Sequence, residues 1–345
     1  MLSKCVAFRV DASAEVGSGH VMRCLALADS IRTKGINVLF VCRKNTGSMV
    51  DLIAARGYVC ESIGEPGCDF EKDAQEVRKA IIKRFPNGVS WLVVDHYGLD
   101  ARWEDKVRGC CRRLMVIDDL ANRPHSCELL LDQNYEDPSR YQGLVPADCR
   151  MLLGPEYALL RPEYAANRGS DSLRRRVLRT VFVFFGGSDP ADLTGKTLKA
   201  LMAPGLIHLK VDVVVGGSYI HHESLSRLSN ERGNTTIHGP QLHLADLMMA
   251  ADLAVGAGGV TNWERMTLGL PSVVITLAEN QVPISGLLHQ RGIIRLLGKS
   301  DDVSVEHIRD ALLDEIQSQK YLDRIVPSMA TCDGQGTGRV LNAML

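Results

Sequence analysis

The stretch CVAFRVDASAEVGSGHVMRCLALADSIRTKGINVLFVC (residues 5–42) has strand-like apolar runs at 5–10 and 37–42, with a glycine-containing turn and a helical pattern between them. Apolar side chains recur at helical spacing at Val21, Cys24, Leu25, Ala28 and Ile31. Gly35 follows as a typical stop, so a helix is predicted over 21–34. A strand, a helix and a second strand in this order predict a parallel βαβ unit.

The same alternation continues along most of the chain. Further strands are predicted at 91–95, 114–118, 128–133, 180–187, 211–217, 235–239, 253–259 and 271–277. Further helices are predicted at 71–84, 191–203, 241–250, 260–269, 281–291 and 305–320. Strands that are apolar throughout and separated by helices lie in parallel sheets covered on both faces, so the predicted fold class is α/β.

The 345 residues exceed the length that one core usually organises, and a polar break divides the pattern in two. This break, AANRGSDSLRRRVLR (165–179), is basic and contains glycine, as expected of a surface crossing. The predicted parts are an N-terminal domain (1–165), a linker (166–178), a C-terminal domain (179–320) and a tail (321–345). Both domains are predicted to be doubly wound and Rossmann-like, and to face each other across a cleft at the carboxyl ends of their strands.

Charge and composition exclude several classes of function. The 40 Lys and Arg residues balance 41 Asp and Glu residues, so neither a nucleic acid nor a membrane is expected as a partner. The sequence shows no signal peptide and no apolar run near the roughly 20 residues that span a bilayer. The ten cysteines include no CxxC pair, which is typical of reduced cytosolic thiols. We therefore expect a cytoplasmic protein and, since nothing in the sequence demands an interface, a monomer.

The turn before the first helix carries the sequence GSGH at residues 17–20. It is not a dinucleotide-binding fingerprint, because Met22 stands at the third glycine position and no ribose-binding acid follows the second strand. His20 lies at the helix start, where the positive helix end disfavours a protonated ring and suits a general base. The flanking Gly17 and Gly19 leave the ring uncovered. The alternative is a histidine that only caps the turn.

A second turn from strand to helix lies in FVFFGGSDPADLTGKTLKALM, residues 182–202. It is not a P-loop, since Pro190 stands where that motif requires a glycine. Gly186, Gly187 and Ser188 still place backbone N–H groups at a predicted helix start, where they can donate to a phosphate oxygen.

A third glycine turn, in AVGAGGVTNWERMTLGLPSVVI (254–275), has more polar side chains around it. Gly256, Gly258 and Gly259 let a ligand approach the backbone closely. The candidate ligand-binding side chains in and after this turn are Thr261, Asn262, Glu264, Asn280 and Gln281. Glu264 either accepts both hydroxyls of a ribose or only favours the helix dipole. The AENQ stretch that follows the next strand either contacts sugar hydroxyls and amides or only caps its loop.

Six stretches occur in the same order as in a known family. They are RVDASAEVGSGHVMRCLALA, VVDHYGLD, VIDDLANRPHSCELLLDQN, GPEYALLRPEY, FFGGSDP, and GAGGVTNWERMTLGLPSVVI with the following ENQ. Together they resemble the PseG-type UDP-sugar hydrolases of pseudaminic acid biosynthesis, over residues from about 5 to 295. The C-terminal part also resembles the UDP-binding half of MurG-like transferases, a likeness of fold and not necessarily of reaction.

The resemblance implies a GT-B architecture and hydrolysis of UDP-2,4-diacetamido-2,4,6-trideoxy-β-L-altropyranose to UDP and the free sugar. In that family water attacks the anomeric carbon and C1–O breaks with inversion, without a metal or other cofactor. The product serves pseudaminic acid biosynthesis and flagellin glycosylation. By resemblance, His20 is the expected base and Glu264 matches the ribose position. Gly187 and Ser188 match the loop at the diphosphate.

Other candidate residues have two interpretations each. By resemblance Tyr97 and Asn280 can orient sugar or water, although Tyr97 can equally pack at its strand end. Arg161, in LLRPE, either meets substrate or caps the crossing segment. Acids also stand at predicted strand ends, at Asp95, Asp118 and Asp119. They are expected to bond backbone N–H groups and order loops, and no metal site is predicted, because the chain contains no D-x-D triplet.

The leading hypothesis is a metal-independent UDP-sugar hydrolase, and other classes stay open. A GT-B glycosyltransferase would pass the sugar from a UDP-sugar donor to an acceptor hydroxyl, with the same histidine as base. A non-catalytic UDP-sugar-binding protein would keep the nucleotide loops without turnover. An epimerase acting on a UDP-sugar is a further option. Release of UDP in the absence of an acceptor distinguishes the hydrolase from these alternatives.

Overall fold

A computed structural model describes residues 5–11, 19–43, 49–64, 69–169, 177–241 and 243–345. The chain forms two compact units: Met1–Arg161 together with Gln335–Leu345, and Pro162–Gly334. The first boundary follows Arg161, a few residues before the expected position at 165, and much of the expected linker lies outside the described residues. The expected tail is divided between the two units, because its last part, Gln335–Leu345, packs on the N-terminal unit.

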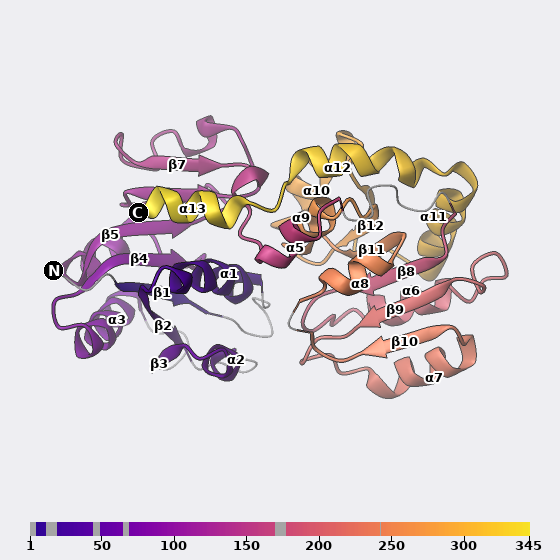
Figure 1. Cartoon of the computed structure of the whole chain (residues 1–345), viewed down its shortest axis with the longest axis horizontal. Coiled ribbons are helices and arrows are strands. Elements are labelled where there is room, and N and C mark those ends of the chain that lie inside the picture. Colours follow the sequence, from indigo (N-terminus) through magenta and orange to yellow (C-terminus); the bar gives the residue numbers. More distant parts are fainter. Residues whose placement is uncertain (1–4, 12–18, 44–48, 65–68, 170–176, 242) are drawn as a thin grey trace. The chain divides into compact units, whose positions relative to one another are not determined.

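The N-terminal unit contains a seven-stranded sheet in the order β3-β2-β1-β4-β5-β6-β7 (Figure 1). Its strands are β1 (Cys5–Val10), β2 (Asn37–Arg43), β3 (Val59–Ile63), β4 (Val89–Asp95), β5 (Cys111–Ile117), β6 (Leu129–Asp132) and β7 (Arg150–Leu153). All of the pairings are parallel. The strand order reverses between β1 and β4, where Val10 pairs with Asp95. Ligands of open α/β sheets bind at the carboxyl ends beside such a switch point.

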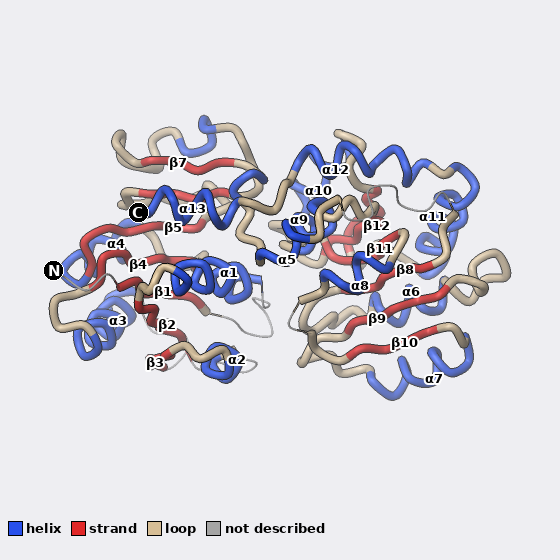
Figure 2. The backbone as a smooth tube through the Cα atoms, viewed as in Figure 1, coloured by secondary structure: helices blue, strands red, loops and turns tan. Residues whose placement is uncertain are grey.

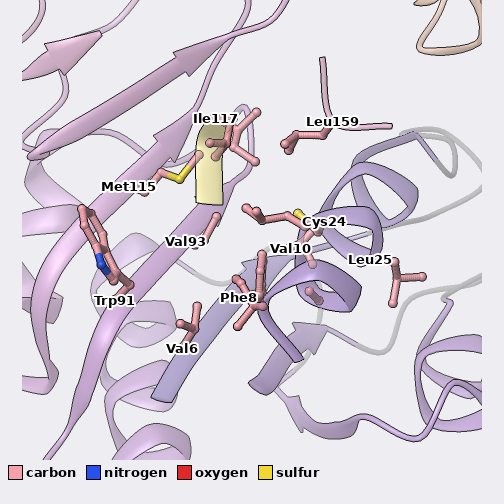
Figure 3. Packing of buried hydrophobic residues seen from close by; sticks show 14 of the residues in the cluster. Val6, Phe8, Val10, Cys24, Leu25, Trp91, Val93, Met115, Ile117 and Leu159 are labelled. Atoms are coloured by element: carbon pink, nitrogen blue, oxygen red, sulfur yellow. The ribbon is translucent and has the colours of Figure 1, made fainter. Parts of the chain in front are cut away.

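Helices cover both faces of this sheet. They are α1 (Gly19–Thr33), α2 (Val50–Ala55), α3 (Phe70–Arg84), α4 (Ala101–Val107) and α13 (Gly336–Met344). One core, which contains Phe8 and Met115, lies between the sheet and the helices α1 and α13 (Figure 3). The other core, with Trp103, lies on the opposite face against α3 and α4. Nε1 of Trp91 donates to the carbonyl of Met344 at 2.8 Å, which ties the last helix to β4.

The C-terminal unit contains a six-stranded sheet in the order β10-β9-β8-β11-β12-β13. Its strands are β8 (Thr180–Phe184), β9 (Lys210–Val214), β10 (Thr235–His238), β11 (Leu253–Ala257), β12 (Ser272–Thr276) and β13 (Arg295–Lys299). These pairings are also parallel. The switch point of this sheet lies between β8 and β11.

Helices again alternate with the strands of this unit (Figure 2). They are α5 (Pro162–Ala166), α6 (Leu193–Ala200), α7 (His222–Arg232), α8 (Ala245–Ala250), α9 (Thr261–Thr267), α10 (Gln281–Gln290), α11 (Val305–Ser318) and α12 (Ile325–Thr331). Short 3-10 helices occur at Arg108–Cys110, Pro138–Tyr141, Pro155–Tyr157 and Lys320–Arg324. Across the described ranges, no helix has both the length and the apolar character needed to cross a membrane.

The two topologies confirm the prediction of two doubly wound α/β domains. Three strands were not predicted: β3, β7 and β13. All three lie at sheet edges or are short, and β3 and β13 are half-buried, so they lack the continuous apolar run of the central strands. The expected cleft between the domains stays a prediction.

Candidate active site

His20 lies in the first turn of α1, and its ring contacts a carboxylate at the end of β4. Nδ1 of His20 and Oδ1 of Asp95 are 2.5 Å apart, and the two side chains are 9% and 0% exposed. The contact forms because β4 is paired with β1, so that Asp95 at the end of β4 lies opposite Val10 at the end of β1, the strand that precedes α1 in the chain. Gly19 is the first residue of the helix, and Gly17 lies outside the described residues.

Two groups contact Nδ1 of His20, Oδ1 of Asp95 at 2.5 Å and Nη2 of Arg23 at 3.1 Å, and the shorter contact determines where the neutral ring carries its proton. Burial disfavours the charged form of Asp95, but Arg23 and His20 outweigh it and hold the pKa of that carboxyl well below its usual range. An ionised carboxylate only accepts hydrogen bonds, so Nδ1 donates to it. Nε2 then carries the lone pair, which is the arrangement that a general base needs.

Arg23, one turn further along α1, completes this cluster. Its Nε donates to Oδ2 of Asp95 and its Nη2 to Oδ1, both at 2.6 Å, a bidentate contact. Nη1 donates to Oδ2 of Asp119 at 3.3 Å. The cluster therefore contains one guanidinium and two carboxylates, and a proton on His20 would balance its charge.

Tyr97, which follows β4, packs against the ring of His20. The ring centroids are 4.7 Å apart and the planes meet at 83°, an edge contact. Burial, then the charge of Asp119 and hydrogen bonding to it, raise the pKa of Tyr97, so the phenol remains a donor. Oδ1 of Asp119 is buried without a hydrogen-bond partner among the described residues. The two predicted catalytic residues thus lie together.

Two other expectations concern this unit. Nη1 of Arg161 lies 4.0 Å from Oδ2 of Asp29, which stands nine residues beyond His20 on α1, roughly 14 Å along the helix axis. Arg161 is therefore separate from the His20 cluster, and its contact with substrate stays a prediction. Asp118 orders its loop as expected, since its Oδ2 accepts from the backbone N–H of Ala121 at 2.8 Å.

In the C-terminal unit, the glycine turn between β11 and α9 is tightly packed. A Cβ at Gly256 would clash with the carbonyl oxygen of Phe184 and lie 2.6 Å from Nη1 of Arg265. A Cβ at Gly258 would lie 2.5 Å from Oγ of Ser285. These two glycines are thus required by neighbouring protein atoms, a reason that the sequence did not reveal.

The predicted ligand-binding side chains of this unit lie beside that turn. Thr261, Asn262 and Glu264 are on α9, while Asn280 precedes α10 and Gln281 begins it. Asn262 is buried, and its carbonyl oxygen accepts from Nη2 of Arg265. Oε1 of Gln281 accepts from the backbone N–H of Leu277 at 2.9 Å, so this side chain does cap its loop. Contacts of the five residues with a ligand stay predictions.

The turn after β8 differs from its prediction. Helix α6 begins only at Leu193, so the expectation that Gly187 and Ser188 stand at a helix start is wrong. The first N–H groups of α6 instead donate to the carboxylates of Asp189 and Asp192, at 2.8–3.1 Å. These acids end the preceding turn and use the helix end that a phosphate would need. A diphosphate contact of Gly187 and Ser188 themselves stays a prediction.

Sequence reasoning missed Arg23 and Arg265, and it interpreted Asp95 as a residue that only orders its loop. A signal for Arg23 was present, because a charged residue one turn after His20 interrupts an otherwise apolar helix. Arg265 gave less indication, since a charged residue on a short helix is usually exposed. Within the described ranges, no three His, Cys, Asp or Glu side chains gather as metal ligands would.

No protein-family model matches the chain. It is 26% identical over 269 residues to the UDP-2,4-diacetamido-2,4,6-trideoxy-beta-L-altropyranose hydrolase of Campylobacter jejuni, a match that covers 72% of this chain and 89% of that protein. The chain is similar to a UDP-sugar hydrolase. This similarity confirms the resemblance to the PseG-type hydrolases that the six motifs indicated.

Two further relatives extend the comparison. The chain is 29% identical over 299 residues to the spore coat polysaccharide biosynthesis protein SpsG of Bacillus subtilis, over 86% of this chain and 84% of that one. It is 23% identical over 286 residues to an uncharacterized protein of Methanocaldococcus jannaschii, over 80% of this chain. The last match spans only 56% of the archaeal protein, which is much longer.

Solved structures share the fold. MurG of Acinetobacter baumannii has a TM-score of 0.65 at 14% identity, and the spinosyn forosaminyltransferase SpnP has 0.65 at 13%, each over 99% of both chains. At such identities the likeness concerns the fold alone. It confirms the expected GT-B architecture.

Proposed function

We propose that this protein hydrolyses a UDP-linked 2,4-diacetamido-2,4,6-trideoxy sugar, UDP-2,4-diacetamido-2,4,6-trideoxy-β-L-altropyranose, to UDP and the free sugar in pseudaminic acid biosynthesis. The similarity to the hydrolase of that name from Campylobacter jejuni supports the substrate class. One observation supports the reaction most directly: Nδ1 of His20 lies 2.5 Å from the buried carboxylate of Asp95, which leaves Nε2 to accept a proton. This dyad suits the activation of water.

In the proposed step, Nε2 of His20 takes a proton from a water molecule as the water oxygen bonds to C1 of the sugar. The C1–O bond breaks, its electron pair leaves with UDP, and the configuration at C1 inverts. Asp95 and Arg23 hold the ring, and the two carboxylates of the cluster stabilise its protonated form. General-base help of this kind contributes about 10²–10⁴-fold to the rate.

The C-terminal unit is proposed to bind the nucleotide. Glu264 would accept the ribose hydroxyls, and the turn between β11 and α9 would lie beside the diphosphate. UDP is a good leaving group when its charge is stabilised, so the step needs no protonation by a strong acid. No metal is assigned to it, because positive charge and backbone N–H groups of the protein can take this role.

A GT-B glycosyltransferase is the second candidate, and the fold shared with MurG and SpnP is the observation that favours it. The same dyad would then deprotonate an acceptor hydroxyl in place of water. The two reactions differ in one observable, because only the hydrolase releases UDP and free sugar when no acceptor is present.

The test uses the purified protein treated with EDTA and given the UDP-sugar in H₂¹⁸O without acceptor. Wild type, His20→Ala and His208→Ala are compared by UDP release and by the mass of the sugar; His208 is an exposed histidine of the other unit and serves as the matched control. We expect ¹⁸O in the sugar, activity in the control, and a loss of about 10²–10⁴-fold in His20→Ala. Label in UDP would mean P–O cleavage and contradict the mechanism, and UDP binding without any release would favour a transferase or a binding protein.

A further inference from the structure

Arg265, on α9, is a fully buried cation whose hydrogen bonds go to neutral oxygens. It is 1% exposed, and its Nη2 donates to the carbonyl oxygen of Ala257 at 2.7 Å and to the side-chain oxygen of Asn262. Its Nε has no hydrogen-bond partner, and no carboxylate among the described residues forms an ion pair with it. Burial lowers the pKa of Arg265 to about 10 although the negative charge of Glu264 opposes this shift, so the side chain is still charged at neutral pH.

Other buried arginines of the chain have their charges or donors satisfied. Arg9 pairs with Asp11 and Asp73, and Arg23 pairs with Asp95 and Asp119. Arg232 also contacts neutral oxygens, but all three of its nitrogens donate to carbonyl groups around the end of α7. An uncompensated buried charge is unfavourable, because the interior solvates it less well than water does. Arg265 therefore has no carboxylate in an ion pair with it among the described residues, and the charge of Glu264, the preceding residue, acts on it only from a greater distance.

The guanidinium of Arg265 lies at the switch point of the six-stranded sheet. A Cβ at Gly256, near the end of β11, would lie 2.6 Å from its Nη1 and would clash with the carbonyl oxygen of Phe184, the last residue of β8. The charge is thus placed beneath the turn that joins β11 to α9, where the strand order reverses. Ligands of such sheets bind outside the carboxyl ends of the strands at this point.

We propose that Arg265 is a positioning residue that provides the buried counter-charge for the diphosphate of a nucleotide bound on this turn. It acts from beneath the backbone without touching the ligand: its charge attracts the diphosphate, and its contacts with Ala257 and Asn262 hold the turn in place. In a poorly solvated interior this attraction persists over several ångströms. The inference rests on the proposed function, because it specifies how that function's nucleotide is bound.

The test measures the affinity of wild type, Arg265→Met and Arg265→Lys for UDP, UMP and uridine by isothermal titration calorimetry. Removal of a buried positive charge weakens the binding of an anionic ligand more strongly the more negative charge that ligand carries. We expect Arg265→Met to bind UDP about ten-fold more weakly, which corresponds to about 1.4 kcal/mol. The loss of affinity should be smaller for UMP and under about two-fold for uridine. Arg265→Lys keeps the charge and is expected to keep most of the preference for UDP over uridine.

Arg232→Met is the matched control, because Arg232 is another buried arginine of the same unit with neutral partners. It should lower the melting temperature and leave the ratio of UDP to uridine affinities unchanged. Equal losses for all three ligands in Arg265→Met would mean a purely structural role and overturn the inference, while hydrolysis and UDP binding by the wild type would leave the proposed function standing. A wild type that hydrolyses nothing and binds no UDP would overturn both.

Discussion

The buried guanidinium of Arg23 in the N-terminal unit lies between two carboxylates, whereas that of Arg265 in the C-terminal unit contacts only neutral oxygens. The two residues are 3% and 1% exposed, so they differ in their hydrogen-bond and ion-pair partners and not in their burial. The first environment places two carboxylates around one guanidinium, and the second has no carboxylate of the described residues in contact with the guanidinium.

This difference fits the movement of charge in the proposed reaction. As C1–O breaks, a proton goes to the base while negative charge grows on the departing UDP. A cluster with two carboxylates stabilises the protonated base, and an unpaired cation stabilises the diphosphate. The proposed reaction thus assigns opposite electrostatic roles to two units with similar sheets, and the following changes test whether their buried charges have those roles.

Asp95→Asn is expected to have the largest effect on catalysis. The amide can donate to Nδ1 of His20 and thereby select the tautomer whose proton is on Nε2, which is the wrong one for a base. We expect kcat to fall about 10³–10⁴-fold with a nearly unchanged KM, as a steady-state assay of UDP release would show.

Asp73→Asn is the control for that variant, because Asp73 is a buried carboxylate of the same unit that pairs with Arg9 and Arg43. It should reduce stability and leave kcat within a few-fold of the wild type. If a folded Asp95→Asn variant kept kcat within ten-fold, the dyad would have no role in catalysis.

Replacement of Arg23 or Arg265 by methionine is expected to lower the free energy of unfolding by different amounts. Arg23→Met leaves two buried carboxylates without their counter-charge and should lower the free energy of unfolding by about 3–5 kcal/mol at pH 7. Arg265→Met removes an unpaired charge, so its smaller loss should stay within about 2 kcal/mol, from the oxygens left unbonded. Urea denaturation measures both, and equal losses would break the comparison.

The pKa of Asp95 determines whether the free energy of unfolding of the wild type and of Arg23→Met rises or falls with pH. In the wild type its pKa is lower in the folded state than in the unfolded state, so its contribution is present above the unfolded pKa of about 3.9 and is lost as the pH falls below it. Without Arg23, burial instead raises this pKa, and the variant should gain stability as the pH falls from 7 to 5. A variant that loses stability over that range would contradict the pairing.

The sequence predicted the parts of the site that depend on local patterns. His20 was proposed from the glycine-containing sequence before it and the helical pattern after it, whereas Tyr97 was proposed only through the family resemblance. The role of Asp95 could not be recognised from the sequence, because its partner His20 stands 75 residues away and only the pairing of β4 with β1 brings the two together. An acid at a strand end looks the same whether it orders a loop or holds a base.

The C-terminal unit shows a second limit of sequence patterns. Its glycine turn was located correctly, but Gly256 and Gly258 were interpreted as room for a ligand, whereas their neighbours are Phe184, Arg265 and Ser285. The fold class was predictable because central strands are continuously apolar. Edge strands such as β3 were missed because most of their side chains are not buried. Tertiary packing decided each of these cases.

Asn262→Asp would convert the surroundings of Arg265 into those of Arg23 by giving it a carboxylate. We expect a higher midpoint in urea, because the buried charge gains a partner, and about ten-fold weaker UDP binding, because the charge is no longer available to the diphosphate. Asn230→Asp adds the same charge at an exposed position on α7 and should change neither property. Unchanged UDP affinity in Asn262→Asp would show that Arg265 does not act through its charge.

Tyr97→Phe is expected to have the smallest effect and to sharpen the description of the first cluster. The ring contact with His20 is retained, and only the hydroxyl that bonds to Asp119 is lost, so kcat should fall about three- to five-fold. Burial and then Asp119 raise the pKa of Tyr97, so the phenol stays protonated and the pH–rate profile should keep its shape in the variant. A loss as large as that of Asp95→Asn, or a basic limb that disappears with the hydroxyl, would mean that Tyr97 itself transfers a proton, and the negative cluster would then serve the tyrosine as well as the histidine.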